Sequence, residues 1–594
     1  MIQYRDISDF FELEAVAAKD KWDALMALPI KERVRKRKAI SDVLLDKEFY
    51  EVNDENYILL KLVVEKNLSD FKEGECLFLH KDGYDSGIKC SLVRFEDDDT
   101  MIVEVFPPNC PRDLGLYHDV PLCLDKDLVD LRQSVYDKFM AKLPSDRGFW
   151  SASILNTQAA PVFKNDMTVI EEELEDTVAN FNLNLLPCQR KAILNCMAAE
   201  DYYLIQGPPG TGKSFVLSFV ILEEMAYFKH KVIVIGPNHM AINNTLIQVA
   251  KNCSGYISNL AKVGQSYNAP EFSVVCDGEE CGIRNYSRIY AYDAAQKEWS
   301  WVIGATPHAL YTSRARGLEC DTLVIDEAGQ MTIPLALMGM INAKKVIFAG
   351  DYKQLPPIVT SDEVCGEMKQ SVFQKLITEE NCTMLDVSFR MCEPICDFVS
   401  ELFYGGEVKA MKKGCGTAVI MGDPLYSFDT PVVIQHVEDY GEQTSDKEAA
   451  FIAAGIERYL ALGLAAKEIA VLSPFRAQAA NVRRFLRQNK NIKSEDCVMV
   501  SVDTIDKMQG QEREVIFFSL AAGDIGYMTE MAEFLYNPNK MNVAFSRAKS
   551  KLIIVGNVNS LRSLDGGEYP HVRKMMASQY VKLFMECPGD VAGC

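Results

Sequence analysis

Residues 207–214, GPPGTGKS, are the stretch whose residue types and spacing could do chemistry. They fit G-x-x-x-x-G-K-[ST], in which glycines let backbone N–H groups turn inward around phosphate oxygens. Lys213 is placed to reach the β- and γ-phosphates of ATP, and Ser214 to hold Mg²⁺. A glycine-rich turn that binds nothing is the alternative. The candidate phosphate-binding residues are Gly207, Pro208, Pro209, Gly210, Thr211, Gly212, Lys213 and Ser214.

The flanks of this loop favour a true phosphate site. Tyr202 to Gln206 is a short apolar run that predicts a buried strand, and Phe215 to Phe228 predicts a helix without a breaker. A strand, a glycine loop and a helix in this order give the structural context that the motif needs. The new helix also points its positive N-terminus at the bound anion.

Two adjacent carboxylates follow another apolar run. Residues 322–325, TLVI, predict a strand that ends in Asp326 and Glu327. Ligands of parallel sheets bind at the carboxyl ends of the strands. We therefore expect Asp326 to hold Mg²⁺ and Glu327 to deprotonate the attacking water as a general base. An ordinary strand end is the alternative for this pair.

Three further polar residues occur in contexts that suit phosphate chemistry. Gln354 follows an expected strand at 345–349 and is a neutral donor that can sense a γ-phosphate, although a proline-terminated loop would look similar. Arg390 and Arg547 lie in SFRM and NVAFSRAK. A lone arginine on a helix is usually a surface charge. In these contexts both are better interpreted as fingers on the transition-state phosphate.

The amino-acid composition limits the kinds of partner and metal site that we expect for this chain. The chain has 594 residues, with 63 Lys and Arg against 84 Asp and Glu, so its formal net charge is −21. A nucleic-acid binder normally carries a basic footprint, so any groove for a polyanion must be local. The 18 cysteines form no C-x-x-C pair, which argues against zinc modules. Scattered cysteines favour reduced thiols and an intracellular protein, and no secretory signal or membrane span is expected.

The N-terminal part predicts helices around a small barrel. Residues 8–48 have near-helical apolar spacing, and residues 31–38, KERVRKRK, are strongly basic. This basic run could be a solvated helix face, a phosphate-contacting face or a targeting signal. Short strands suggest a β-barrel over about residues 56–124, and a helix is expected over Asp125–Leu143. The expected strands are Tyr57–Val64, Cys76–His80, Ile88–Phe95 and Met101–Phe106, with a turn at Asp97-Asp98-Asp99 before the last.

From residue 183 onward, apolar strands alternate with helical segments, which is typical of parallel α/β domains. Two sets of strands predict two doubly wound domains with a break near 380–390. The first set is 202–206, 231–236, 301–305, 322–325 and 345–349, and the second is 431–437, 469–473, 498–503, 515–520 and 551–556. The expected domains are 1–143, a connector at 144–182, 183–385 for ATP binding, and 386–594.

The ordered motifs then point to a family. QGPPGTGKS, VIDEAGQ, GDYKQLPP, SFRM, VDTIDKMQGQE and NVAFSRAK resemble those of superfamily one helicases over about residues 183–557. The set is most similar to the group that contains the nonsense-mediated decay helicase, senataxin and the immunoglobulin mu-binding helicase. The resemblance implies two RecA-like domains and an N-terminal helical stalk that carries the barrel.

The resemblance also implies residue roles. Gln189 would read the adenine edge, Phe389 would stack on adenine where relatives often have Tyr, and Glu512 would approach the ribose. The nucleic-acid backbone would meet Pro237, Asn238, Thr306 and Thr504. The sequence departs from the family in Leu185-Leu186-Pro187-Cys188 before Gln189, where relatives often have Leu-Asn, and in a short segment between Gly264 and Val302.

These observations predict an ATP- and Mg²⁺-dependent helicase or translocase on single-stranded DNA or RNA. The resemblance implies 5′-to-3′ movement. A monomer is expected, in the cytoplasm, or in the nucleus of a eukaryotic host. One alternative is an ATP-gated clamp that remodels nucleoprotein without unwinding. Another is a non-catalytic scaffold, against which the intact set of Lys213, Asp326, Glu327, Gln354, Arg390 and Arg547 argues.

Overall fold

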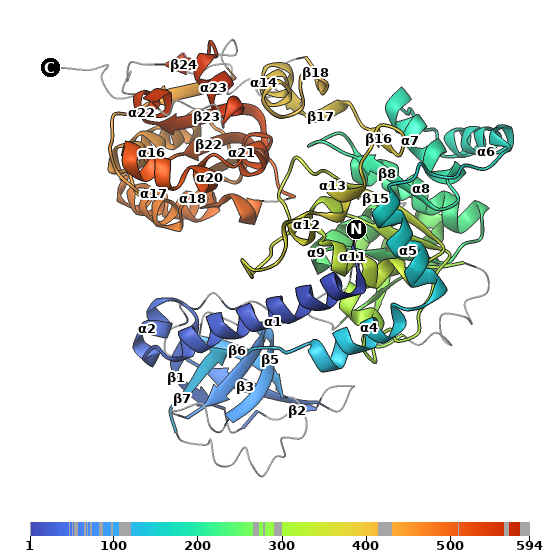
Figure 1. The fold of residues 1–594 in the computed structure, drawn as a ribbon. Coiled ribbons are helices and arrows are strands. Elements are labelled where there is room, and N and C mark those ends of the chain that lie inside the picture. The colour runs from blue at the N-terminus through green and yellow to red at the C-terminus, as the bar shows by residue number, and fades with distance from the viewer. Residues whose placement is uncertain are drawn as a thin grey trace.

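The computed structural model describes residues 2–46, 48–49, 51–52, 57–64, 67, 69, 71, 74–81, 87–96, 99–105, 120–264, 272–276, 279–289, 300–413, 431–508, 510–563 and 569–582. They form a small barrel and two parallel α/β lobes. In Figure 1 the barrel lies at the lower left, lobe one at the right and lobe two at the upper left. None of the described helices has the length and apolar character that crossing a membrane requires.

Lobe one is built on a nine-stranded sheet in the order β11-β12-β10-β13-β9-β14-β15-β8-β16. All neighbours are parallel except β11 and β12. The five strands expected from sequence are β8 (Tyr202–Gln206), β9 (Val232–Ile235), β13 (Val302–Gly304), β14 (Thr322–Ile325) and β15 (Lys345–Gly350). The sequence did not predict β10 (Leu260–Val263), β11 (Phe272–Cys276), β12 (Glu279–Tyr286) and β16 (Cys382–Met384).

Helices cover both faces of this sheet, because its central strands are buried on both sides and carry continuous apolar runs. One face packs against α7 (Pro187–Ala198), α8 (Lys213–Leu222) and α9 (His239–Asn252). The other packs against α11 (Ile333–Met340) and α13 (Val372–Leu376), with α12 (Gly366–Lys369) nearby. The helix expected over 215–228 continues past α8 as a π-helical turn at Glu223–Tyr227. The segment 144–182 forms α5 (Asp146–Thr157) and α6 (Met167–Asn180), which contact α11 and α7.

Lobe two has a six-stranded parallel sheet in the order β21-β20-β22-β23-β19-β24. The strands are β19 (Val432–His436), β20 (Ile469–Ser473), β21 (Ser501–Thr504), β22 (Arg513–Ser519), β23 (Ala548–Gly556) and β24 (Val581–Lys582). The helices are α14 (Glu393–Phe403), α16 (Asp446–Ala461), α17 (Arg476–Gln488), α18 (Ser494–Met499), α19 (Ile525–Glu530), α20 (Ala532–Leu535), α21 (Pro538–Phe545), α22 (Val558–Ser563) and α23 (Pro570–Ala577). A two-stranded sheet of β17 (Val387–Cys392) and β18 (Lys409–Lys412) leads from lobe one into it.

The predicted small barrel is confirmed as a closed ring of six strands, with β2 (Glu51–Val52) beside it. The ring contains β1 (Ala39–Leu45), β7 (Leu122–Lys126), β4 (Cys76–His80), β5 (Gly87–Phe95), β6 (Thr100–Val105) and β3 (Ile58–Val63). The helix predicted over 8–48 is therefore wrong beyond Arg35, because Ala39–Leu45 buries mainly one face, as a strand does. The turn expected at Asp97-Asp98-Asp99 lies partly outside the described residues.

A pair of helical segments joins the barrel to lobe one. Helix α1 (Tyr4–Met26) runs out toward α2 (Ile30–Arg35) and the barrel, and the chain returns through a π-helical turn at Arg132–Tyr136 and α4 (Asp137–Lys142). The two segments pack through Phe11 and Tyr136, whose rings stack with centroids 4.0 Å apart. The returning helix starts at Arg132 and not at Asp125, because Leu122–Lys126 belongs to the barrel.

The arginines of the basic run at 31–38 differ in their burial. Arg33 is buried, and its Nε lies 2.9 Å from Oδ1 of Asp125, whose other oxygen lies 2.8 Å from His80 Nε2. A solvated helix face is therefore the wrong interpretation for Arg33, which is buried against strands β4 and β7 of the barrel. Arg35 is exposed and remains available to a polyanion.

Candidate nucleotide site between the two lobes

The phosphate loop connects β8 to α8 at the carboxyl edge of the sheet of lobe one. Gly210 and Gly212 have φ angles of 73° and 82°, a region that glycine adopts without steric cost. A Cβ on Gly210 would lie 2.4 Å from the Cβ of Arg390. The backbone N–H of Phe389 donates to Gly210 O at 2.8 Å, and Ser388 Oγ donates to Pro209 O at 2.9 Å. The strand that carries Phe389 and Arg390 thus lies directly on the loop.

Lys213 meets both carboxylates predicted from sequence. Its Nζ lies 2.5 Å from Asp326 Oδ1 and 2.9 Å from Glu327 Oε1. Although burial by itself lowers the pKa of Lys213, the two carboxylates outweigh it and hold that pKa above its ordinary value. The other oxygen of Asp326 accepts a hydrogen bond from Thr245 Oγ1 at 2.6 Å. The carboxylate of Asp326 is therefore fixed at the end of β14, beside the phosphate loop.

Glu327 is oriented by its backbone and by a neighbour. It has a φ of 54°, which is uncommon for a residue with a side chain and turns the chain sharply after β14. Gln330 Nε2 donates to Glu327 Oε2 at 2.8 Å. The side chain of Glu327 is 31% exposed, so water can reach it. This accessibility suits a general base better than the buried position of Asp326 would.

Gln354 of lobe one contacts Arg547 of lobe two. The Nη2 atom of Arg547 donates to Gln354 Oε1 at 3.1 Å, and Gln354 Nε2 donates to Asp351 Oδ2 at 2.9 Å. Arg547 is 3% exposed, and within the described ranges no carboxylate lies within 4.0 Å of it. Burial, with Arg390 nearby, lowers the pKa of Arg547 to about 9. An incoming anion would relieve this unfavourable charge.

Residues of lobe two hold the side chain of Arg390 in place. Its Nε lies 2.6 Å from Glu512 Oε2, and its Nη1 donates to Ser546 O at 3.2 Å. Glu512 also pairs with Lys549 at 3.2 Å. Burial opposes ionisation of Glu512, but Arg390 and Lys549 hold its pKa below the ordinary value. Glu512 thus positions Arg390, while its expected contact with a ribose stays a prediction.

The two residues expected at adenine lie on either side of one glycine. A Cβ on Gly212 would be 3.1 Å from Gln189 Nε2 and 3.9 Å from Phe389 Cε2. Gln189 Oε1 accepts from the backbone N–H of Leu186 at 3.1 Å. The ring of Phe389 is 37% exposed and can still stack on a base. The structure therefore brings Gln189 and Phe389 together beside the phosphate loop.

The residues expected at the nucleic acid lie at the carboxyl ends of strands. Asn238 follows β9 and Pro237, and its Oδ1 accepts from Ala241 N at 2.9 Å as the cap of α9. Thr306 follows the neighbouring strand β13 and caps the 3₁₀ turn Pro307–Tyr311. Thr504 ends β21 in lobe two and is 8% exposed. The contacts of these residues with a nucleic-acid backbone stay a prediction. Helix capping alone accounts for the side-chain hydrogen bonds of Asn238 and Thr306.

Sequence reasoning missed four residues of this region: Thr245, Asp351, Tyr404 and Asn542. Thr245 holds Asp326, and the other three hydrogen-bond to one another or to the loop that carries Gln354. Asp351 had a signal, because it lies in the quoted GDYKQLPP. Asn542 had one too, as the first residue of NVAFSRAK, whereas Thr245 and Tyr404 had none, because their partners are far away in the sequence.

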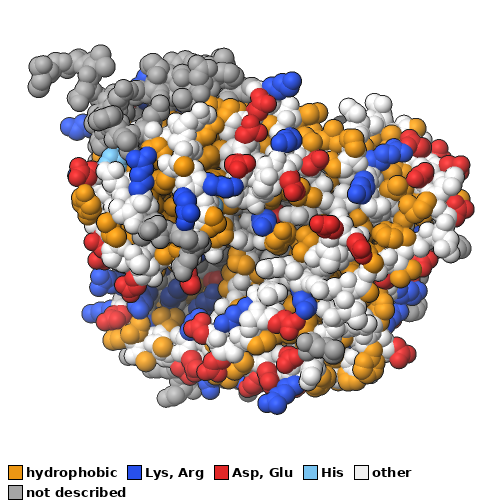
Figure 2. Space-filling view, turned by 45° about the horizontal axis from the view of Figure 1, so that its top comes forward, with side chains coloured by type: hydrophobic (Ala, Val, Ile, Leu, Met, Phe, Trp, Pro, Cys, Tyr) orange, Lys and Arg blue, Asp and Glu red, His pale blue; other side chains and the backbone are white. Residues whose placement is uncertain are grey.

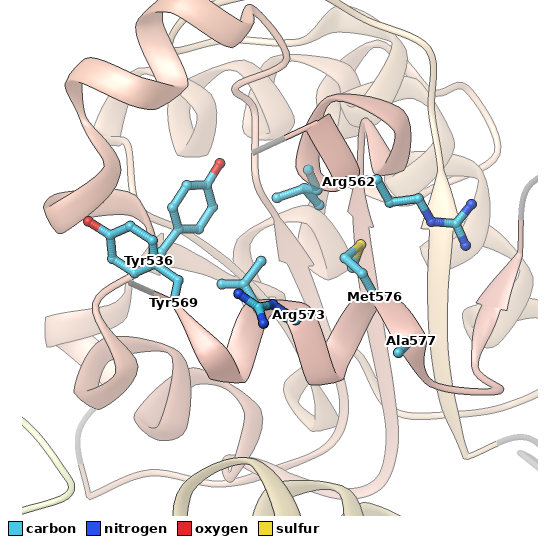
Figure 3. Close-up of a pocket in the computed structure, with 8 residues that line it drawn as sticks. Tyr536, Arg562, Tyr569, Arg573, Met576 and Ala577 are labelled. Atoms are coloured by element: carbon cyan, nitrogen blue, oxygen red, sulfur yellow. The ribbon is translucent and has the colours of Figure 1, made fainter. Parts of the chain in front are cut away.

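A cavity of about 240 Å³ lies in lobe two, away from this site. Figure 3 shows Tyr536, Tyr569, Arg573 and Met576 around it, with α23 along one side. None of the residues predicted to bind nucleotide or nucleic acid lines it. The candidate site is therefore defined by the meeting of charged residues between the lobes and not by this cavity.

Comparison with known proteins is consistent with two ATPase domains in this order. Residues 184–278 and 298–362 match one family model described as an AAA domain, and residues 368–559 match a second with the same description. Both lobes are thus RecA-like, as their parallel sheets indicate.

Similar proteins include several that are named as helicases. An uncharacterized ATP-dependent helicase of Methanocaldococcus jannaschii is 26% identical over 475 residues, which cover 64% of this chain and 69% of that protein. The DNA replication ATP-dependent helicase/nuclease DNA2 of Mus musculus is 26% identical over 433 residues, 66% of this chain and 39% of that one. The DNA polymerase alpha-associated DNA helicase A of Schizosaccharomyces pombe is 26% identical over 457 residues, 66% of each chain. The match thus covers between 39% and 69% of the length of these three relatives.

Proposed function

We propose that this chain, an ATP-dependent helicase of superfamily one, couples ATP hydrolysis to movement along single-stranded nucleic acid. One observation carries the proposal: charged residues from both lobes meet around a single phosphate loop. Lobe one contributes Lys213, Asp326 and Glu327, and lobe two contributes Arg390 and Arg547. A site divided in this way is complete only when the lobes approach each other, so its chemistry depends on their relative movement.

The residues present also suit Mg²⁺. Ser214, at the end of the phosphate loop, and Asp326, which pairs with Lys213 of that loop, offer a hydroxyl and a carboxylate oxygen, the hard ligands that Mg²⁺ prefers. A bound ion neutralises charge on the β- and γ-phosphate oxygens. Thr245 keeps the carboxylate of Asp326 in place through its 2.6 Å hydrogen bond. Mg²⁺ as the cofactor is part of this proposal.

The roles of the protein groups follow from their positions. Backbone N–H groups of the loop and the N-terminus of α8 bind the phosphates, and Lys213 adds a positive charge. Glu327, oriented by Gln330, takes the proton of the attacking water. Arg390 and Arg547 stabilise the charge that develops on the transferred phosphoryl group. Hydrolysis removes this shared anion, and the lobes can then separate.

Alternate closing and opening would move the chain along a strand that crosses the carboxyl edges of both sheets. On the face in Figure 2 the surface is hollowed between lobe two and the barrel, and Lys and Arg side chains are visible in the hollow. Two of the relatives have DNA in their names, which favours DNA over RNA as the track. We propose 5′-to-3′ movement from the resemblance to the decay helicase group.

Tailed duplexes test this function. We expect ATP-dependent strand displacement from a DNA duplex with a 5′ single-stranded tail, weaker displacement from a 3′ tail, and weaker displacement from the matching RNA duplexes. Displacement of a strand-bound protein without strand separation would support the clamp alternative. If ATP drives neither kind of displacement on any substrate, the proposed function is wrong.

The exposed part of the basic run gives a further prediction. For the native chain we expect log K for single strands to fall with log salt concentration with a slope of roughly −2 to −5. Charge reversal at Arg35 is expected to weaken this binding and, if Arg35 touches a phosphate, to make the slope shallower by about one unit. The matched control is Lys467→Glu, an equal charge change at an exposed residue before β20, at the edge of the sheet opposite the ligand edge. Equal slopes for both variants would show that Arg35 only faces solvent.

We also propose that the protein works inside the cell as a monomer. Cysteines that the structure describes in detail, such as Cys196, Cys253 and Cys396, are buried free thiols packed in the cores of the lobes. Such thiols suit a reducing compartment, the cytoplasm or the nucleus of a eukaryotic host. Size-exclusion chromatography with light scattering would test the monomer: a dimer mass at micromolar concentration would contradict it.

A further inference from the structure

A network of hydrogen bonds between the lobes surrounds one buried carboxylate, that of Asp351 at the end of β15. Asp351 is 3% exposed. Its Oδ1 accepts from Gln206 Nε2 at 3.2 Å and from the backbone N–H of Lys353 at 3.1 Å. Its Oδ2 accepts from Gln354 Nε2 at 2.9 Å and from the hydroxyl of Tyr404 at 2.6 Å. Three of these donors belong to lobe one, and only Tyr404 comes from beyond it.

Tyr404 follows α14 and is anchored within lobe two. Its hydroxyl accepts a hydrogen bond from Asn542 Nδ2 at 2.7 Å while it donates to Asp351. Asn542 lies on α21, one residue before Val543, whose carbonyl accepts from Arg547 Nε at 3.0 Å. Burial and the charge of Asp351 raise the pKa of Tyr404 well above its ordinary value, so the hydroxyl remains a donor. The contact thus joins the helix before the arginine finger to the end of β15.

Asp351 in turn orients the residue that we place at the γ-phosphate. The amide of Gln354 is held at both ends, with Nε2 on Asp351 Oδ2 and Oε1 on Arg547 Nη2. Tyr404 and Gln354 therefore donate to the same oxygen. When the lobes separate, the hydroxyl of Tyr404 must leave that oxygen, and Oδ2 of Asp351 loses one of its two described donors, the one that comes from lobe two.

We propose that Tyr404 is a positioning residue of the ATPase site, which makes the orientation of Gln354 depend on the approach of lobe two. The inference rests on the proposed function of this site. Tyr404 does not touch the nucleotide; it acts through Asp351 on Gln354. Closure of the lobes then sets the phosphate sensor and the arginine finger in one movement, because both Tyr404 and Arg547 come from lobe two.

The test is a double-mutant cycle on nucleic-acid-stimulated ATP hydrolysis in the full chain. Tyr404→Phe keeps the ring and removes the hydroxyl. We expect its stimulated kcat to fall about tenfold, the size of one lost hydrogen bond to a charged group, while KM for ATP changes less than about threefold. Because Tyr404 acts through Gln354, Tyr404→Phe added to Gln354→Ala should lower kcat no further than Gln354→Ala alone.

Tyr202→Phe is the matched control. The hydroxyl of Tyr202 also donates to an oxygen, Ala159 O, at 2.5 Å and accepts from an asparagine, Asn381 Nδ2, at 3.2 Å, but at the opposite end of β8 from the phosphate loop. We expect it to leave kcat and the cycle unchanged. If the two variants lower kcat to the same extent, or if the effects of Tyr404→Phe and Gln354→Ala multiply, the inference is wrong.

Failure of the proposed function gives a different result. If the native chain shows no stimulation by nucleic acid, the function fails before the cycle is measured. If native stimulation is strong and Tyr404→Phe keeps the native kcat, only the role of Tyr404 is refuted. Should thermal unfolding show that Tyr404→Phe does not fold, Asn542→Ala replaces it in the same cycle, because it removes the donor that orients the hydroxyl. A multiplicative cycle with that variant would also overturn the inference.

Discussion

Replacing Glu327 by glutamine is expected to leave ATP binding nearly intact while hydrolysis slows by about 10²–10⁴-fold, the usual contribution of a general base. Glutamine keeps the shape and the oxygen that accepts from Gln330, so the turn after β14 should hold. What is lost is the ability to take a proton from water. Binding is measured with a fluorescent ATP analogue, and hydrolysis by phosphate release.

Two comparisons make this result specific. Lys213→Ala should weaken both binding and hydrolysis, because Lys213 contributes charge to the phosphates as well as to Asp326 and Glu327. Glu319→Gln is the matched neutral control, because this half-exposed carboxylate pairs with Lys142 and Arg147 outside the site. Hydrolysis at the native rate by Glu327→Gln would show that another group is the base.

Removing either arginine is expected to have a comparable or larger effect. Arginine fingers commonly contribute about 10³–10⁵ in rate, and Arg390→Ala and Arg547→Ala should each lose stimulated hydrolysis by an amount in that range. Arg547→Ala also removes a buried charge that has no described carboxylate within 4.0 Å, so this variant should remain folded. Stimulated turnover and thermal unfolding are measured on the same samples.

Arg562→Ala serves as the control, because this exposed arginine of lobe two lies at the cavity of Figure 3 and not at the phosphate loop. It should hydrolyse ATP at the native rate. Near-native stimulated turnover in both Arg390→Ala and Arg547→Ala would mean that lobe two takes no part in the chemistry, and the divided site would have to be abandoned.

The sequence predicted the parts of this site that are contiguous. The glycines of the phosphate loop and Lys213 lie within eight residues of one another. Asp326 and Glu327 can be recognised because they follow directly after an apolar run. The parallel strands were equally visible, because buried strands such as β14 carry continuous apolar residues. The barrel was predicted from a series of short segments rich in β-forming residues, although its first strand was missed.

What could not be predicted depends on pairing between distant segments. Ala39–Leu45 follows a helix and a basic run, and only its ladders with β7 and β3 make it a strand. The short strands β10 and β16 are similar cases, because four or three residues carry too little pattern. Tyr404 looks like an ordinary core residue until the fold brings its hydroxyl to Asp351. The motifs pointed to the arginines that approach the phosphate, but no sequence pattern indicated the hydrogen bond from Tyr404 to Asp351.

We propose that nucleic acid and lobe closure together switch on ATP hydrolysis at the divided site. The decisive measurement is the steady-state ATPase activity of the full chain, titrated separately with single-stranded DNA and single-stranded RNA. We expect low activity without nucleic acid and saturable stimulation, strongest with DNA, that Glu327→Gln, Arg390→Ala and Arg547→Ala all abolish. Activity that neither nucleic acid changes, in a folded chain that binds ATP, would contradict it.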